Sequence, residues 1–361
     1  MEKTDILAIN PGSTSTKLGI YRNMELFLET TIRHNPEELL AFGPIAMQRD
    51  YRTKYVQEFL KENNYDTARL KAVVGRGATI RGLSSGGYLA DEDFCKATED
   101  PTISQHACNL GAPIARSIAE PLGIPAYIYD APIGTDLTEV AKVTGVAGIE
   151  REGKYHVLNS RAQAINYGEK IGKEYKDLSL IVCHLGGGIT VTAHQGGKIV
   201  DGLSYDDGPM APERTGSIPL LNWNTLCYSG KYTAEEIEKL VCGKGGLYSH
   251  LGTTDCREVV KRIEAGDEKA KLVFEAMGYQ VAKSIANVSV ALKGKMDTII
   301  ITGGIAHSKY LTDIIMDYAA HIGPFTLMPG EDELFALANG ANRLVEGKEE
   351  VKIYCLPGRE A

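Results

Sequence analysis

The sequence predicts an α/β fold built from two similar halves. A β-branched run, Ile6 to Ile9, leads into a turn of small polar residues and a second apolar run, Leu18 to Tyr21, which together indicate strand, turn and strand. A faint copy of this segment, shifted by 174 residues, places Cys183 to Thr190 over Ile9 to Thr16. The chain has 361 residues, which is long enough for two domains. These observations favour a duplicated α/β unit with one such hairpin in each half.

The other elements follow from apolar periodicity and from proline and glycine breakers. Pro36 suits a first helical position, and Thr233 with Glu236 forms a capping box. A long apolar stripe from Val273 to Leu292 predicts a core helix that Gly294 ends. In chain order we expect helices near 36–40, 55–60, 106–120, from 233, 273–292 and 334–345, and strands near 73–74, 125–129, 178–197 and 298–301.

Composition excludes several classes of partner. The 39 basic and 47 acidic residues give a formal net charge of −8, which argues against nucleic-acid binding because phosphate backbones need a basic surface. Seven widely spaced cysteines without a C-x-x-C pair favour neither disulfides nor zinc and suit a reducing cytoplasm. The first residues lack a signal-peptide pattern. The most apolar segment, Leu178 to Gly197, holds five glycines and is predicted as paired strands, so no membrane association is expected.

Several familiar catalytic motifs are absent from the sequence. The dipeptide Gly-Lys occurs seven times, but Ser or Thr never follows it, so there is no Walker A loop. No histidine is followed by glutamate, which removes the zincin motif, and the protein-kinase motifs are missing too. No G-x-G-x-x-G follows a strand, which disfavours a dehydrogenase.

Three turns of small residues follow apolar strands, at 10–17, 184–190 and 302–306. Glycine lets backbone N–H groups approach phosphate oxygens, and the hydroxyls of Ser13, Thr14 and Ser15 add donors. A single turn of this kind is equally well explained as a tight hairpin that needs glycine. Three in one chain, with Lys17 beside the first, favour a nucleotide ligand.

These segments resemble the acetate and butyrate kinase family, which belongs to the superfamily of actin and sugar kinases. The resemblance runs in order along nearly the whole chain, through Ile9 to Lys17, Val73 to Gly77, Asp130 to Pro132, Tyr155 to Asn159, His184 to Gly188, Pro212 to Gly216, Thr302 to Gly304 and Pro329 to Leu334. It implies two actin-like (ribonuclease H-like) domains with a central active-site cleft. It also implies reversible, ATP-dependent phosphorylation of butyrate or a similar short or branched-chain acid.

The resemblance implies ATP or ADP together with Mg²⁺. The nucleotide-binding residues it implies are Asn10, Ser13, Ser15 and Lys17 at the first hairpin, His184, Gly186, Gly187 and Gly188 at the second, and Gly303 and Gly304 against the adenosine. Mg²⁺ takes oxygen ligands and keeps several waters, so one or two carboxylates suffice. Asp130 and either Glu331 or Glu333 are implied as those carboxylates, and the sequence does not separate the two glutamates.

The catalytic residues implied are Arg76, Arg214, His156 and Asp130. Arg76 and Arg214 would lie between the substrate carboxylate and the γ-phosphate, with His156 beside them. A guanidinium meets a carboxylate in a bidentate fork, and fixed cations stabilise the charge of a transferring phosphoryl group. His106 matches a family histidine less closely, and its role stays open. Arg76 stands inside a glycine run and Ala78 replaces a usual glycine, which leaves the preferred acyl chain open.

Two other functions stay open at this stage. One is an actin-like kinase acting on a sugar hydroxyl, which would need a base such as Asp130 to remove the proton. The other is a nucleotide-driven binding module. For the domains, pattern and resemblance together place an N-terminal domain at 1–150 and a C-terminal domain at 151–334, with 335–361 packing back on the first. A homodimer or higher homo-oligomer is expected.

Overall fold

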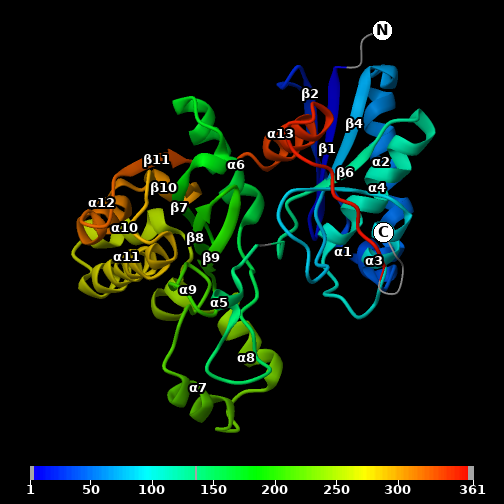
Figure 1. Cartoon of the computed structure of the whole chain (residues 1–361). Helices are drawn as coiled ribbons and strands as arrows, with labels where there is room; N and C mark the ends of the chain where they lie inside the picture. Colours follow the sequence, from blue (N-terminus) through cyan, green and yellow to red (C-terminus); the bar gives the residue numbers. More distant parts are fainter. Residues whose placement is uncertain (1–3, 135, 357–361) are drawn as a thin grey trace. The chain divides into compact units, whose positions relative to one another are not determined.

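The computed structural model describes residues 4–134 and 136–356. It contains two α/β units, each with its own sheet and core (Figure 1). The first unit comprises Met1–Gly134 together with Asp332–Ala361, and the second comprises Thr135–Glu331. Residues 357–361 of the expected C-terminal segment lie outside the described residues. No helix within the described residues is both long and apolar enough to cross a membrane.

The sheet of the first unit has six strands in the order β3-β2-β1-β4-β6-β5. Their bounds are β1 Asp5–Pro11, β2 Ser15–Arg22, β3 Glu25–Arg33, β4 Leu70–Arg76, β5 Gly87–Leu89 and β6 Ala126–Tyr129. The pairs β1–β2, β2–β3 and β5–β6 are antiparallel, whereas β4 is parallel to both β1 and β6. The carboxyl ends of β1, β4 and β6 therefore reach the same edge of this sheet.

Helices cover both faces of the first sheet because its strands carry apolar side chains on each side. Leu7 and Ile9 belong to the same core as Phe59 and Ile114 on one face. Side chains alternate along a strand, so Tyr21 and its neighbours face the other way, where Tyr21 packs edge-on against Phe335 at 5.9 Å. The helices of this unit are α1 Pro36–Ala41, α2 Arg49–Glu62, α3 Glu92–Thr98, α4 Gly111–Ala119 and α13 Glu333–Val345.

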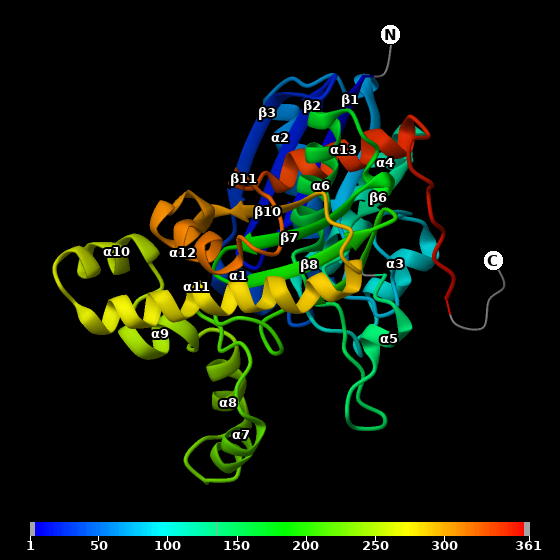
Figure 2. The same ribbon diagram turned by 60° about the vertical axis from the view of Figure 1, so that its left-hand side comes forward.

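The sheet of the second unit has five strands in the order β11-β10-β7-β8-β9. Their bounds are β7 Ser179–Leu185, β8 Ile189–Gln195, β9 Lys198–Leu203, β10 Thr298–Gly303 and β11 Phe325–Pro329. The helices are α5 Glu139–Lys142, α6 Val157–Ile171, α7 Leu220–Cys227, α8 Ala234–Val241, α9 Gly246–Leu251, α10 Cys256–Glu264, α11 Glu268–Ser289 and α12 Lys309–Ala319. The long helix α11 lies beside β7 and β8 (Figure 2), where Phe274 and Met277 join the core of Cys183 and Val191.

The two sheets share the topology of five strands, and the first sheet adds β5, antiparallel to β6, at its edge. β1 begins at Asp5 and β7 at Ser179, which is the shift of 174 residues seen in the sequence. In both sheets an antiparallel meander of three strands continues through parallel strands on the side of the first strand. The structure thus confirms the duplicated α/β unit, and it also confirms the capping box of Thr233 and Glu236.

The second unit begins at Thr135, whereas the sequence pattern placed the domain boundary near residue 150. The segment around α5 joins the second unit because it is bonded to β9 and the loop after it. The Thr138 N–H donates to the Val200 carbonyl at 3.1 Å. Arg151 forms ion pairs with Asp201 at 2.9 Å and Asp207 at 3.1 Å. At the other end of the chain, the N–H of Lys352 donates to the Gly87 carbonyl at 2.9 Å, beside β5 of the first unit.

Candidate active site

The first hairpin joins β1 to β2 and carries four of the predicted site residues, Asn10, Ser13, Ser15 and Lys17. Its turn is closed by a hydrogen bond from the Gly12 N–H to the Ser15 carbonyl at 2.7 Å. Asn10 and Lys17 are cross-strand partners, so both side chains lie on one face of the hairpin. Ser13 and Lys17 are exposed, which leaves a hydroxyl and an ammonium accessible to a ligand.

Arg76, the last residue of β4, is the centre of a polar cluster in the first unit. Its Nη1 lies 2.8 Å from Glu333 Oε1, and Asn10 Nδ2 donates to Glu333 Oε2 at 2.7 Å. The same Nη1 lies 3.4 Å from Asn10 Oδ1. The parallel pairing of β1 and β4 brings Asn10 and Arg76 to one sheet edge, and α13 begins there with Glu333. The Arg76 side chain is 27% exposed, so its guanidinium can bind a carboxylate that enters from solution.

Asp130 follows β6 at the same edge but is 1% exposed. Its Oδ1 accepts a hydrogen bond from the Gly86 N–H at 2.8 Å, and its own N–H donates to the Gly86 carbonyl at 3.1 Å. The backbone of Asp130 has φ +46°, in the left-handed region.

His106 caps a short 3₁₀ helix by accepting from the Cys108 N–H at 3.2 Å. Burial, with the positive charge of Arg76, lowers the pKa of His106.

Two histidines stack in the second unit. The rings of His156, just before α6, and His184, on β7, lie 3.9 Å apart with an interplanar angle of 21°. Asn159 Nδ2 lies 2.7 Å from His184 Nδ1, and Thr190 Oγ1 lies 3.1 Å from His156 Nδ1. Because an amide nitrogen only donates, His184 Nδ1 accepts, and a neutral His184 ring then carries its proton on Nε2. Asn159 and Thr190 therefore hold the two imidazole rings through their Nδ1 atoms.

Arg214 and His156 flank the second hairpin, whose turn holds Gly186, Gly187 and Gly188. A Cβ built on Gly188 would lie 3.4 Å from His156 Cε1 and 3.9 Å from Arg214 Nε. Arg214 Nη1 pairs with Glu213 Oε1 at 2.8 Å. The structure thus brings Arg214, His156 and the glycine turn together around one small space, and the absence of side chains on the turn keeps that space open.

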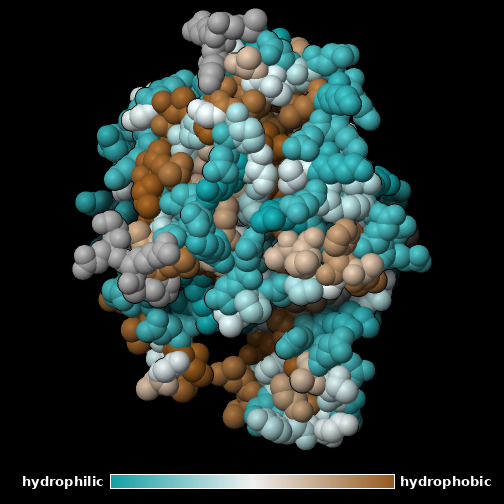
Figure 3. Space-filling view, turned by 90° about the vertical axis from the view of Figure 1, so that its right-hand side faces the viewer, coloured by the Kyte–Doolittle hydropathy of each residue, from teal (hydrophilic) through white to brown (hydrophobic). Residues whose placement is uncertain are grey.

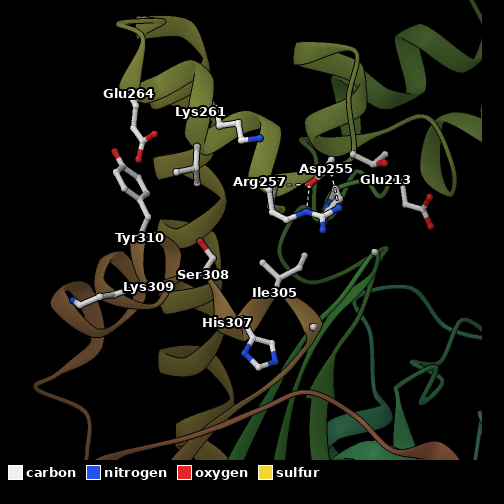
Figure 4. Close-up of a pocket in the computed structure, with 16 residues that line it drawn as sticks. Glu213, Asp255, Arg257, Lys261, Glu264, Ile305, His307, Ser308, Lys309 and Tyr310 are labelled. Atoms are coloured by element: carbon white, nitrogen blue, oxygen red, sulfur yellow. Dashed lines mark hydrogen bonds and ion pairs between the residues drawn. The ribbon is translucent and has the colours of Figure 1, made fainter.

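A cavity of about 1040 Å³ opens beside the glycine turn in the second unit. Figure 4 shows it between α10 on one side and the 3₁₀ turn η7, Gly304–His307, with the start of α12 on the other. Gly187 and Glu213 line one end, and Ile305 and Tyr310 line another part of the wall. The cavity is large enough for a nucleoside, because ligand pockets commonly measure about 300–1,000 Å³.

Gly303 is the residue immediately before η7. Its φ of +88° favours glycine, and a Cβ at this position would collide with the backbone of Leu185 on the neighbouring strand. Gly303 and Gly330 exchange two backbone hydrogen bonds, at 3.2 and 3.0 Å. These two hydrogen bonds fix the backbone at Gly330, directly before Glu331. Glu331 Oε2 lies 3.6 Å from His184 Nε2.

The acidic residues predicted for a metal belong to different units of the chain. Glu333 belongs to the first unit and Glu331 to the second, and Asp130 is bound to backbone. Throughout residues 4–134 and 136–356, no three His, Cys, Asp or Glu side chains are grouped as metal ligands. This donor set does not form an all-protein cage. It does fit a Mg²⁺ ion that arrives on nucleotide phosphates and needs only one or two carboxylates from the protein.

Sequence reasoning left out three residues that contact the predicted site. Asn159 lies in the first turn of α6, three residues after His156 at the helix N-cap, and this spacing brings two side chains to the same side. Glu213 immediately precedes Arg214, so its pairing is local in the sequence. Thr190 is the cross-strand partner of His184, and the strand register alone would have identified it.

Comparisons with known proteins agree with this architecture. A model of the acetokinase family matches residues 142–360. The "Probable butyrate kinase 2" of Caldanaerobacter subterraneus subsp. tengcongensis is 44% identical, covering 97% of this chain and 99% of the relative. "Butyrate kinase 2" of Clostridium acetobutylicum is 42% identical, covering 98% of this chain and 99% of the relative.

Solved structures share the fold at low sequence identity. Porphyromonas gingivalis acetate kinase superposes with a TM-score of 0.75 at 18% identity, covering 94% of this chain and 100% of that one. A propionate kinase from Francisella tularensis gives 0.75 at 17% identity, covering 93% and 98%. These matches confirm the predicted actin-like α/β class. With a family model over more than half of its length and close relatives over nearly all of it, the chain belongs to the acetokinase family.

Proposed function

We propose that the protein is an ATP-dependent carboxylate kinase that reversibly transfers the γ-phosphoryl group to butyrate or a similar short or branched acid. The observation that carries this proposal is the partly exposed Arg76, whose guanidinium already binds a carboxylate, that of Glu333. A substrate carboxylate offers the same geometry to the same fork. The relatives named butyrate kinase support butyrate as the acid.

The catalytic roles divide between two guanidinium groups and one imidazole. Arg76 orients the substrate carboxylate, while Arg214 and His156 bind the transferring phosphoryl group. A carboxylate is already ionised at neutral pH, so no base is required and transfer is direct. Most of the rate enhancement then comes from fixed positive groups that match the charge of the transition state.

The nucleotide is held by the residues around the two hairpins. Asn10, Ser13, Ser15 and Lys17 offer donors in the first unit. In the second unit the turn at Gly186 to Gly188 and His184 bind phosphate oxygens, and the cavity beside Gly303 and Gly304 takes the adenosine. Glu333, with Asp130 or Glu331, would hold Mg²⁺. When bound, this ion neutralises charge on the phosphate oxygens.

We also propose a homo-oligomer that acts in the cytoplasm and binds neither nucleic acid nor membrane. All seven cysteines are free thiols, as expected in a reducing compartment. The segment 217–244, which includes α7 and α8, projects from the rest of the second unit (Figure 2). Leu220 and Leu221 are each 82% exposed on it, and Tyr228 is 85% exposed. An apolar surface of this kind is favourable to cover with a second copy.

Apolar residues also lie on the segment around α5, in the same unit. Val140 and Val143 are exposed there, as are Val146 and Ile149. Figure 3 shows brown, apolar side chains at the lower end of the face that it draws. The two segments together offer a larger apolar area than either alone.

Trapping the product tests the proposed reaction. The purified protein is supplied with MgATP, hydroxylamine and one acid at a time, from acetate to butyrate and isobutyrate. We expect hydroxamate to form, with the highest kcat/KM for a four-carbon acid. A panel of sugars under the same conditions serves as the second arm. ADP release with sugars but no hydroxamate with any acid would establish a hydroxyl kinase, and ATP hydrolysis without transfer to either would establish a binding module.

A further inference from the structure

The side chain of Arg52, on α2, contacts the turn of the first hairpin. It is 0% exposed and donates to the backbone of the turn through both terminal nitrogens. Nη1 donates to the carbonyls of Gly12 at 2.8 Å and Ser15 at 3.0 Å, and Nη2 donates to the Ser13 carbonyl at 3.1 Å. Gln48 Oε1, one helical turn earlier, accepts from Nε at 3.2 Å and from Nη2 at 3.0 Å. One guanidinium therefore holds three carbonyls of a single turn.

All of these acceptors are neutral oxygens. Within the part of the chain that the structure describes, no carboxylate lies within ion-pair distance of Arg52. Burial lowers the pKa of Arg52 to about 10, so the group still carries its charge at neutral pH. Burial and the neighbouring Arg52 lower the pKa of His34, which contacts the same hairpin through Thr16, to about 4. His34 is therefore neutral at pH 7 and adds no second charge.

A buried charge without a counter-ion is costly and is rarely retained for packing alone. The hairpin of the second unit shows that the cost is avoidable. There the Gly187 carbonyl accepts from a backbone amide, the Glu213 N–H at 3.4 Å, instead of a charged side chain. The first hairpin thus uses a cation where the matching hairpin uses a neutral donor.

The direction of the peptide groups shows where this charge acts. No cis peptide bond occurs in the described chain, and in a trans peptide the C=O and the following N–H point in opposite directions. The Gly12 and Ser13 carbonyls point at Arg52, so the N–H groups of Ser13 and Thr14 point away from it. Both residues are exposed, and neither N–H has a hydrogen-bond partner among the described residues. Two adjacent free N–H groups on one side of a turn form an anion-binding concavity.

We propose that Arg52 is a positioning residue for phosphate binding: it fixes the turn so that the Ser13 and Thr14 N–H groups face the nucleotide phosphates, and it places an unneutralised positive charge behind them. The proposal rests on the proposed function, because that function supplies the phosphate ligand. Arg52 itself touches no substrate. Its effect is specific to phosphate and does not extend to the nucleoside.

The test compares Arg52→Gln, Arg52→Lys and Thr53→Val. Thr53 is buried on the same helix, and its hydroxyl has no partner within residues 4–134 and 136–356, so Thr53→Val controls for changes in α2. The measurements are the equilibrium Kd values of ATP and of adenosine, the steady-state constants and the melting temperature. For Arg52→Gln we expect ATP affinity and kcat each to fall by about tenfold or more, with adenosine affinity unchanged. Arg52→Lys keeps the charge and should recover part of the loss.

Each other outcome has a definite meaning. Wild-type ATP affinity and kcat in Arg52→Gln would overturn the proposal, and so would an equal loss of ATP and adenosine affinity. If Arg52→Gln does not fold, Arg52→Lys and Gln48→Leu decide, because Gln48→Leu leaves the arginine but removes one of its anchors. Selective loss of ATP affinity in these variants supports the proposal, and unchanged affinity overturns it. Absence of hydroxamate with the wild-type protein would instead reject the proposed function.

Discussion

His156 and His184 stack almost in parallel, at 3.9 Å, although they are 28 residues apart in the chain and come from different elements. The stacking is set from both sides, since Asn159 holds His184 and Thr190 holds His156. Both hydrogen bonds are made at Nδ1, and Nε2 of His184 lies 3.6 Å from Glu331 Oε2. The pair therefore presents a fixed edge next to the glycine turn.

Asn159→Leu is expected to release His184 while keeping a side chain of similar size. The lost hydrogen bond leaves Nδ1 without its donor, so both tautomers become populated and kcat falls by about tenfold. Long-range ¹H–¹⁵N spectra of the imidazole report the tautomer directly. Gln163→Leu, on the same helix, is the control. A wild-type spectrum and kcat in Asn159→Leu would show that Asn159 does not orient the ring.

Arg214→Ala is expected to lower kcat by on the order of 10³ with little change in nucleotide affinity, because its charge acts on the transferring group in the transition state. Arg214→Lys should recover only a small part, since an ammonium cannot form a planar fork. Steady-state kinetics and nucleotide titration measure the two quantities separately. An unchanged kcat in Arg214→Ala would remove this residue from the mechanism.

Arg76→Ala should raise the KM for the acid and also lower kcat. If Arg76 and Arg214 act on one transition state, their effects are not independent, and the double variant loses much less than the product of the single losses. The double-variant cycle is measured as kcat/KM for butyrate. Simple multiplication of the two losses would mean that the arginines serve different steps.

Acid is expected to destabilise the protein through His194, which is fully buried between Tyr175 and Thr192. Burial lowers its pKa from 6.5 to about 3. Between these values the unfolded state binds a proton that the folded state does not, so the stability present above pH 6.5 is lost as the pH falls. The slope from this one group is at most about 1.4 kcal/mol per pH unit.

Thermal melting from pH 7 to 4.5 checks this prediction. His194→Gln keeps a side chain capable of hydrogen bonding but cannot titrate, so its melting temperature should depend less steeply on pH than that of the wild type. His321→Gln, at an exposed position, is the control. Equal slopes in wild type and His194→Gln would exclude His194 as the acid-sensitive group.

Leu220→Glu combined with Leu221→Glu is expected to convert the oligomer to single chains, because a charge cannot be buried in an apolar contact without a partner. Light scattering after size-exclusion chromatography gives the mass. Val290→Glu places one such charge at an exposed apolar residue elsewhere in the second unit and should leave the mass unchanged. A wild type that elutes as one chain would contradict the oligomer itself.

The two hairpins were the easiest elements to predict, for a local reason. A strand that ends in small residues and returns as a strand is encoded within about 15 residues, so both hairpins could be located from the sequence. Asp130 was placed correctly after a strand, but its burial and its bonds to Gly86 depend on a partner 44 residues away. Local pattern carries no information on such a contact.

Arg52 shows the same limit more clearly. In the sequence it is one basic residue in a helix of mixed composition, and most residues of that kind face water. Its burial follows from tertiary packing of α2 beneath a hairpin some 37 to 40 residues earlier. The contact-based division of the chain lies before residue 138 instead of near 150 for a related reason, since the Thr138 N–H donates to the Val200 carbonyl of β9, 62 residues later in the chain.

The C-terminal helix α13 completes the first unit, and Glu333 on it is the partner of Arg76. The second unit is thus inserted within the chain of the first. During synthesis on the ribosome, the second unit is fully translated before the N-terminal sheet receives its last helix. A ribosome that stalls shortly before Asp332 would leave Arg76 without its carboxylate and the sheet with one uncovered apolar face.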